Sequence, residues 1–429
     1  MSSHNSAISP AYNTPASVVV PFYGYAALFL VVASCLLFCN SSSLLQHYFN
    51  PKSLAITHAM ALGWGTMMIL GASHQLVPVM IDSPLYSEKL GYACFLLAAI
   101  GIPLLVYGFY SFNLGAPAKW GGRLVILSVI CFLVNLSKSF SKSKQDTVHG
   151  TFLFTAVCWL LLTTLVGLIL LYNMGMPLLP EASLHYLTLH AHIGIVGWFL
   201  LMIMGVAARL IPMFLVSKYV NAKLLWWIYA LLNIGLMSFC AGFFRPAQSM
   251  FYFIPAALVG SALLLFLFYC YQCYQYRIKR SADQPVKLSL LAVMLLLAPL
   301  LVLLIIIAAQ DAGTEQVKLI NAYGFSIFFG WITALILGMT FKTLPFIIWN
   351  KVYHSVAGLE KVPPPATLFS NNLFIAMAAA YIMGFGLFMT GIFTASLLLV
   401  KIAAALLLLA ALLFNGNVFK IIFHRPIKK

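Results

Sequence analysis

Stretches of about twenty apolar residues follow one another along almost the whole chain, separated by short polar segments. A helix of about twenty such residues spans the hydrocarbon core of a bilayer. Only 7% of the 429 residues are charged, against roughly 25% in soluble domains. The sequence therefore predicts an all-α polytopic membrane protein with twelve transmembrane helices. The expected spans lie near residues 18–39, 54–80, 90–110, 122–139, 151–173, 185–215, 223–243, 249–272, 287–309, 317–348, 371–392 and 394–418.

The distribution of basic residues predicts how these spans are oriented. Loops after even-numbered spans, together with the C-terminal tail, contain sixteen Lys and Arg residues, and loops after odd-numbered spans contain five. Basic loops stay in the cytoplasm, so we expect both termini there, with the chain in the plasma (bacterial inner) membrane. The formal net charge of +16 is then a feature of membrane topology and does not indicate nucleic-acid binding.

We expect one membrane domain over residues 18–420, between a polar tail of residues 1–17 and a basic cytoplasmic tail of residues 421–429. A repeat runs through this domain, because the pattern Gly-Trp-x4-Ile-x-Gly-x6-Pro occurs three times, beginning at Gly63, Gly197 and Gly330. The spacing of 134 and 133 residues corresponds to four helices each time. Internal repeats are a strong guide to architecture. The pattern predicts three four-helix repeats, near 18–139, 151–272 and 287–418, around a pseudo-threefold axis.

Histidine is the main candidate for chemistry inside the membrane. His58 and His192 occupy equivalent positions in the first two repeats, each five residues before its Gly-Trp pair, and Phe325 takes this position in the third. Two equivalent imidazoles on related helices can face each other across one pocket, as bis-histidine coordination of heme requires. We expect His58 and His192 to bind heme iron together.

His190 is the third expected ligand, and it lies on the same helix as His192. Side chains two residues apart on a helix point about 200° apart, so these two histidines should serve two adjacent pockets. Trp64 and Trp198 are candidates to pack on a heme ring. Candidates to bind its propionates are Arg245, Lys52, Arg123 and Lys318, and His185 is a further candidate metal ligand.

The segment from His190 to Phe214, which begins His-Ala-His-Ile-Gly, resembles the His-x-His helix of heme-copper oxidase subunit I. The segment Leu76 to Ile81, with His58 upstream, resembles the second helix of that family. The resemblance implies a low-spin heme between His58 and His192 and a second, high-spin heme on His190. The placement of histidines on the second and sixth spans is also similar to that of NnrS-type heme-binding membrane proteins.

The chain departs from the oxidase family at the copper site. No counterpart is found for the family's copper ligands, which include a His-His pair, and the seventh span contains no histidine. We therefore expect one or two b-type hemes without copper, and a role in electron transport or in heme- or nitric oxide-related redox chemistry. Its partners would be membrane lipid and respiratory-chain subunits or a periplasmic electron carrier. Two alternatives stay open: a terminal oxidase or nitric oxide reductase with atypical ligands, and a heme-free transporter or scaffold.

Overall fold

The computed structural model describes residues 14–143, 147–244, 249–279, 281–310, 316–355, 357 and 362–426, with backbone alone at 249, 250 and 310. Within these residues, twelve helical spans are long and apolar enough to cross a membrane, which confirms the number expected from the sequence. The spans are α1 (Ala16–Cys39), α2 to α3 (Pro51–Met80), α4 (Glu88–Tyr110), α5 (Ala116–Phe140), α6 (Val148–Asn173), α7 to α8 (Ser183–Leu215), α9 (Ala222–Phe243), α10 (Phe253–Gln275), α11 to α12 (Gln284–Ala309), α13 to α14 (Val317–Tyr353), α15 (Asn371–Thr394) and α16 (Leu397–Ile422).

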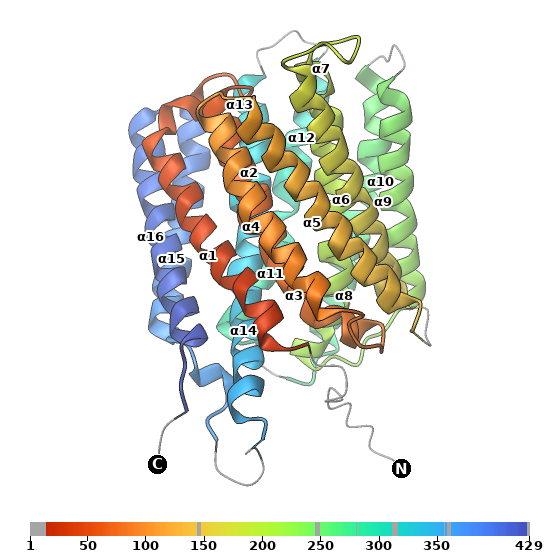
Figure 1. Cartoon of the computed structure of the whole chain (residues 1–429), viewed down its shortest axis with the longest axis vertical. Helices are drawn as coiled ribbons and strands as arrows, with labels where there is room; N and C mark the ends of the chain where they lie inside the picture. The colour runs from red at the N-terminus through yellow and green to blue at the C-terminus, as the bar shows by residue number, and fades with distance from the viewer. Residues whose placement is uncertain are drawn as a thin grey trace.

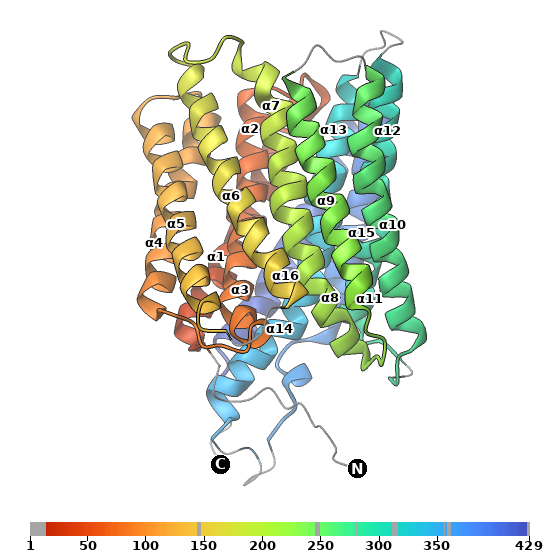
Figure 2. The same cartoon turned by 90° about the vertical axis from the view of Figure 1, so that its right-hand side faces the viewer.

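The helices stand side by side in one bundle, and α1 begins and α16 ends at the same end of it, the lower end in Figure 1. The second span along the chain therefore runs downward, and its first residues lie at the upper end. Figure 2 shows α6, α9 and α10 standing along one side of the bundle at nearly its full height. Most of the loops that connect the spans are short, so neighbours in sequence are usually neighbours in space.

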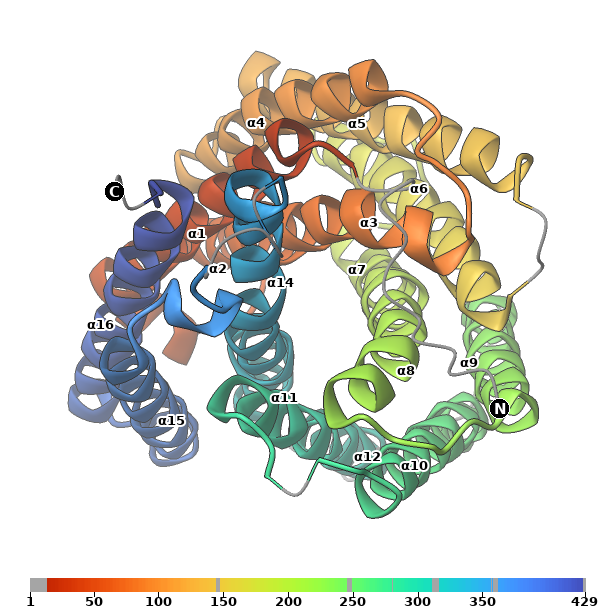
Figure 3. The same cartoon turned by 90° about the horizontal axis from the view of Figure 1, so that it is seen from below.

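Three of the spans lie in the interior of the bundle. In an apolar 18-residue stretch of each span, 78% is buried in α2 to α3 and in α7 to α8, and 83% in α13 to α14. The corresponding stretch is at most 50% buried in the other nine spans. Figure 3 shows α3 (Met67–Met80), α8 (Leu201–Leu215) and α14 (Thr333–Tyr353) inside the ring of outer helices. The interior spans are the ones that contain the Gly-Trp pattern.

Each interior span changes from α- to π-helical geometry for two turns at its Gly-Trp pair. These π segments are η3 (Ala59–Thr66), η4 (Ile193–Leu200) and η6 (Ser326–Ile332). A π turn widens the helix, leaves some backbone groups differently paired, and is frequent at functional sites. In each case the segment directly follows the position of His58, His192 or Phe325.

Buried tryptophans join the three interior spans to one another. Trp64, Trp198 and Trp331 are at most 2% exposed. The indole Nε1 of Trp64 donates a hydrogen bond to Oγ1 of Thr333 at 3.1 Å, and that of Trp198 donates to Oγ1 of Thr66 at 3.0 Å. A buried indole N–H without a partner is costly, so these bonds hold the spans in a defined register at mid-depth.

Candidate heme-binding site

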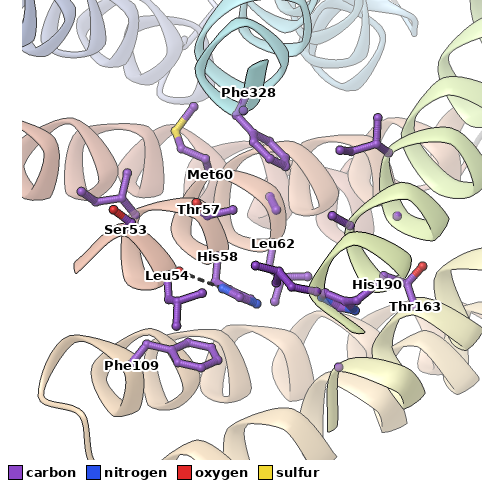
Figure 4. A pocket seen from close by; sticks show the side chains of 18 of the residues that line it. Ser53, Leu54, Thr57, His58, Met60, Leu62, Phe109, Thr163, His190 and Phe328 are labelled. Atoms are coloured by element: carbon purple, nitrogen blue, oxygen red, sulfur yellow. Dashed lines mark hydrogen bonds between the residues drawn. The ribbon is translucent and has the colours of Figure 1, made fainter. Parts of the chain in front are cut away.

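A cavity of about 310 Å³ opens in the upper half of the bundle, between α2 (Pro51–His58), α4, α5, α6 and α7 (Ser183–His192), and it extends to α13 (Val317–Phe325). Its lining is largely apolar and includes Phe109, Gly122, Gly167 and Phe328. His58 and His190 both line it, and Figure 4 shows their rings pointing into the same part of the cavity. An apolar cavity of this size with a few convergent polar groups is typical of a cofactor site.

His58 is the last residue of α2 and is held by its own helix. Its Nδ1 lies 2.8 Å from the carbonyl oxygen of Leu54, one turn earlier, and Figure 4 marks this bond. A carbonyl can only accept, so Nδ1 donates and Nε2 keeps its lone pair. The ring also packs against Phe109 of α4, with centroids 4.5 Å apart. The hydrogen bond to Leu54 fixes the tautomer of His58, and the packing on Phe109 fixes the orientation of its ring, as a metal-binding imidazole needs.

His190 approaches the cavity from α7 and lies against α6. A β-carbon added to Gly167 would come within 2.8 Å of the His190 Cε1 atom, so the absence of a side chain there makes room for the ring. Thr163, one turn earlier on α6, lies beside the same ring (Figure 4). Among the described residues, Nδ1 of His190 is buried without a hydrogen-bond partner. This nitrogen is covered by protein and does not face the cavity, and the Thr163 backbone is the hydrogen-bonding group beside the ring.

The rings of His58 and His190 form a pair. Their centroids are 6.4 Å apart and their planes differ by 17°. The two side chains come from spans that are about 130 residues apart in the sequence. In the described part of the chain, no group of three or more His, Cys, Asp or Glu side chains gathers to chelate a bare ion. The histidine pair is therefore the strongest candidate for a prosthetic group.

His192 lies on the opposite side of α7 and faces another gap of the bundle. Its Nδ1 lies 2.8 Å from the carbonyl oxygen of Thr188, and its Nε2 accepts a hydrogen bond from the Tyr323 hydroxyl at 3.2 Å. Its ring also contacts Phe239 of α9. The structure thus brings His58 together with His190, where the sequence had led us to expect His192. The predicted divergence of the two side chains is present, but the rotation of α7 directs His190 toward α2.

Position 325, which matches positions 58 and 192 in the sequence repeat, is a phenylalanine packed against other phenylalanines. The Phe325 ring stacks on Phe388 with centroids 4.0 Å apart and planes within 9°, and it also stacks on Phe329 at 4.9 Å. Aromatic stacks of this kind fill the space that an imidazole and a ligand would need. The three positions that match in the sequence repeat are therefore part of a His-His pair, a His-Tyr pair and a phenylalanine stack.

The other residues expected at the site lie apart from the pair or at its edge. Trp198 lines the cavity, whereas Trp64 packs edge-on against Phe414. His185 is exposed near the upper end of α7, with its ring 5.2 Å from that of Phe243. Arg245 lies outside the described residues.

Two of the expected cations, Lys52 on α2 and Arg123 on α5, lie toward the upper end of the bundle, and neither is among the residues that line the cavity. The Lys52 ammonium stands 3.3 Å from the ring centroid of Tyr110 and donates to the Tyr110 carbonyl at 3.0 Å. The Arg123 guanidinium donates to the Tyr172 hydroxyl. Lys318, by contrast, is exposed on α13.

The sequence analysis did not identify Tyr323 and Gly167. Tyr323 could have been found from the repeat, because a shift of 133 residues from His190 leads to position 323 (190 + 133). The contact of Gly167 with His190 leaves no such signal, since glycines are frequent in transmembrane helices for packing reasons alone.

No protein-family model and no curated protein sequence matches this chain.

Proposed function

We propose that this chain is a heme-binding integral membrane protein in which His58 and His190 are the two axial ligands of one b-type heme, and that it transfers electrons. The observation that carries the proposal is the pair of nearly parallel imidazole rings with centroids 6.4 Å apart. An imidazole nitrogen ligates a transition metal at about 2 Å, and it lies about 1 Å from its ring centre, so two rings on one iron have centroids roughly 6 Å apart. The observed centroid separation is close to this value, which is one of two requirements, the other being that a nitrogen of each ring faces the same iron.

The surroundings of the pair also suit a porphyrin. The tautomer that the Leu54 carbonyl imposes on His58 leaves its Nε2 free to act as a ligand. Gly167 leaves room for the His190 ring and Gly122 for the Leu168 side chain, so these two glycines shape the wall of the cavity. The apolar walls would exclude water and set the redox potential of the iron.

The coordination chemistry favours electron transfer over oxygen reduction. A bound heme supplies a one-electron iron couple. His58 and His190 would both hold the iron, which would leave it no open position for a small molecule. His192, whose two nitrogens are engaged by Thr188 and Tyr323, offers less support for a second heme. The proposed role is therefore that of a copper-less relative of oxidase subunit I that exchanges electrons with a membrane or periplasmic partner.

The same proposal includes the architecture and the orientation. Three buried Gly-Trp π segments on the three interior spans support three four-helix repeats around a pseudo-threefold axis. The excess of Lys and Arg in the lower loops and C-terminal tail supports a cytoplasmic lower end in a bacterial inner membrane. The cavity would then lie near the outer surface, where a periplasmic electron carrier could reach it.

The test is a reduced-minus-oxidised absorption spectrum of the purified protein with its His58→Ala, His190→Ala and His192→Ala variants. We expect b-type bands in the wild type, loss of the low-spin bands in the first two variants, and their retention in His192→Ala. Absence of b-type bands from the wild type, or unchanged bands in the His58 and His190 variants, would refute the proposal. Loss in His192→Ala with retention in His190→Ala would restore the pair first expected from the sequence.

A further inference from the structure

Two cations near the upper end of α5 converge on one tyrosine of α6. The Lys119 ammonium lies 4.7 Å from the ring centroid of Tyr172, and the Arg123 guanidinium donates a hydrogen bond to the Tyr172 hydroxyl. Lys119 and Arg123 are four residues apart on the helix, so their side chains leave it on one face. Neither cation lines the cavity, and Arg123 is exposed on the outer surface of the bundle.

This pair of cations has no carboxylate to neutralise it. Within the described part of the chain, the ion pairs are those of Asp283 with Lys279 and with Lys342, and Asp283 precedes α11 at the lower end of the bundle. Two like charges four residues apart on a helix repel each other, so an anion placed between them is stabilised by both. The Tyr172 hydroxyl accepts a hydrogen bond from Arg123 and keeps its own proton for a further acceptor.

Aromatic side chains place these cations at a membrane surface. Lys119 and Arg123 lie near the start of α5, and Tyr172 lies at the end of α6. Trp120, between the two cations, is 55% exposed, and the Arg123 guanidinium lies 4.8 Å from its ring centroid. Tryptophan and tyrosine near the ends of spanning helices form the aromatic belts at the headgroup level. An anion bound between the cations would therefore lie among lipid headgroups.

Apolar stripes run down the outer faces of α5 and α6 below the cations. The two helices stand side by side (Figure 2) and pack directly on each other, with Gly122 of α5 against Leu168 of α6. On both helices, exposed large apolar side chains recur every three or four residues, so each set lies on one face. The stripes contain Leu127, Ile130 and Val134 on α5, and Leu162, Leu165 and Ile169 on α6.

The stripe on α5 has the length of one lipid leaflet. Eleven residues separate Arg123 from Val134, and at 1.5 Å per residue they extend over about 16 Å. The hydrocarbon core of a bilayer is about 30 Å thick, so one leaflet contributes roughly half of that. An acyl chain that starts at the cations would therefore follow the stripe to its lower end.

We propose that an anionic phospholipid binds at this place, with its phosphate between Lys119 and Arg123 and its acyl chains along the two stripes. The proposal does not depend on heme binding. Lysine and arginine donate charge-assisted hydrogen bonds to phosphate oxygens, and a guanidinium can donate two at once. The Tyr172 hydroxyl donates a further one. The rings of Tyr172 and Trp120 hold the cations in place by cation–π attraction.

The test measures lipid binding to the full-length protein, delipidated in detergent, by native mass spectrometry. The probes are phosphatidylglycerol, phosphatidylcholine and glycerol phosphate, the last being a headgroup without chains. We expect the wild type to bind phosphatidylglycerol about fivefold or more tightly than phosphatidylcholine, since one cation near a membrane surface contributes about that factor. Lys119→Gln and Arg123→Gln should each lower the phosphatidylglycerol affinity about fivefold. Lys401→Gln is the matched control and should not lower it, because it alters an exposed cation near the upper end of α16.

Equal affinities of the wild type for the two lipids would overturn the proposal, and so would unchanged phosphatidylglycerol binding in the Lys119 and Arg123 variants. An equal loss in Lys401→Gln would also overturn it, because general surface charge would then explain the preference. Glycerol phosphate that binds as tightly as the whole lipid would exclude the role of the stripes. Should a glutamine variant not fold, Tyr172→Phe takes its place: it keeps the ring, removes the hydroxyl, and should weaken phosphatidylglycerol about fivefold, and an unchanged affinity would overturn the proposal.

Discussion

Replacing Gly167 by alanine places a methyl group directly against the His190 ring. The added β-carbon would lie 2.8 Å from Cε1, and ordinary contact begins near 3.4 Å, so the ring must retreat by about 0.6 Å (3.4 minus 2.8). A ligand bond of about 2 Å tolerates little of that displacement. Loss of groups that orient a metal ligand typically costs 10–100-fold in affinity, and we expect a heme affinity lower by about that factor.

The stability of the Gly167→Ala protein should change much less than its heme affinity. Overpacking costs about 1–3 kcal/mol, and alanine in place of glycine within a helix returns about 1 kcal/mol, so the net loss should stay below about 2 kcal/mol. Heme titration and thermal unfolding of the heme-free protein in detergent measure the two effects separately. Gly386→Ala is the matched control, because a β-carbon there meets no atom of the described structure within 4 Å.

Wild-type heme affinity and an unchanged low-spin spectrum in Gly167→Ala would contradict this prediction. It also fails if the control variant loses heme to the same extent. Either result would mean that the contact between Gly167 and His190 does not determine where the imidazole stands.

Two further predictions concern stability. Burial raises the pKa of Asp283, but hydrogen bonds and charges from its lysine partners outweigh burial, so the pKa is lowered overall. A lowered folded-state pKa stabilises the fold above the unfolded-state pKa of about 3.9, and this stabilisation is lost as the pH falls through the folded-state value. Asp283→Asn should therefore lower the free energy of unfolding by less than about 1 kcal/mol at pH 7, because the carboxyl is partly exposed. It should also make the melting temperature fall less steeply as the pH is lowered into the acid range. An unchanged acid dependence of the melting temperature would contradict this. Gly338→Ala should lower the melting temperature by an amount equivalent to about 1–3 kcal/mol, because the added β-carbon would lie 2.3 Å from Oγ of Ser289. Gly416→Ala is the control and should not lower it, because a β-carbon at position 416 meets no described atom within 4 Å.

The sequence alone determined the class of the protein and the number of its spans. Only helices and closed β-barrels satisfy their backbone groups within lipid, and apolar runs of about twenty residues have the length of spanning helices, so twelve such runs with 7% charged residues indicated a helical membrane protein. Helical geometry also required that His190 and His192 point to different sides of one helix, and the structure agrees. These conclusions depend on composition and on local periodicity, both of which can be read without knowing any tertiary contact.

Only the tertiary structure decided which histidine faces His58. The rotation of α7 about its own axis is set by the packing of its whole surface, including the contact of His190 with Gly167 on α6 and the bond of His192 to Tyr323 on α13. The sequence repeat relates His58 to His192, but it does not say which side chains of neighbouring spans meet. His58 lies beside His190 and His192 beside Tyr323, and only the packing of the helices shows these pairings.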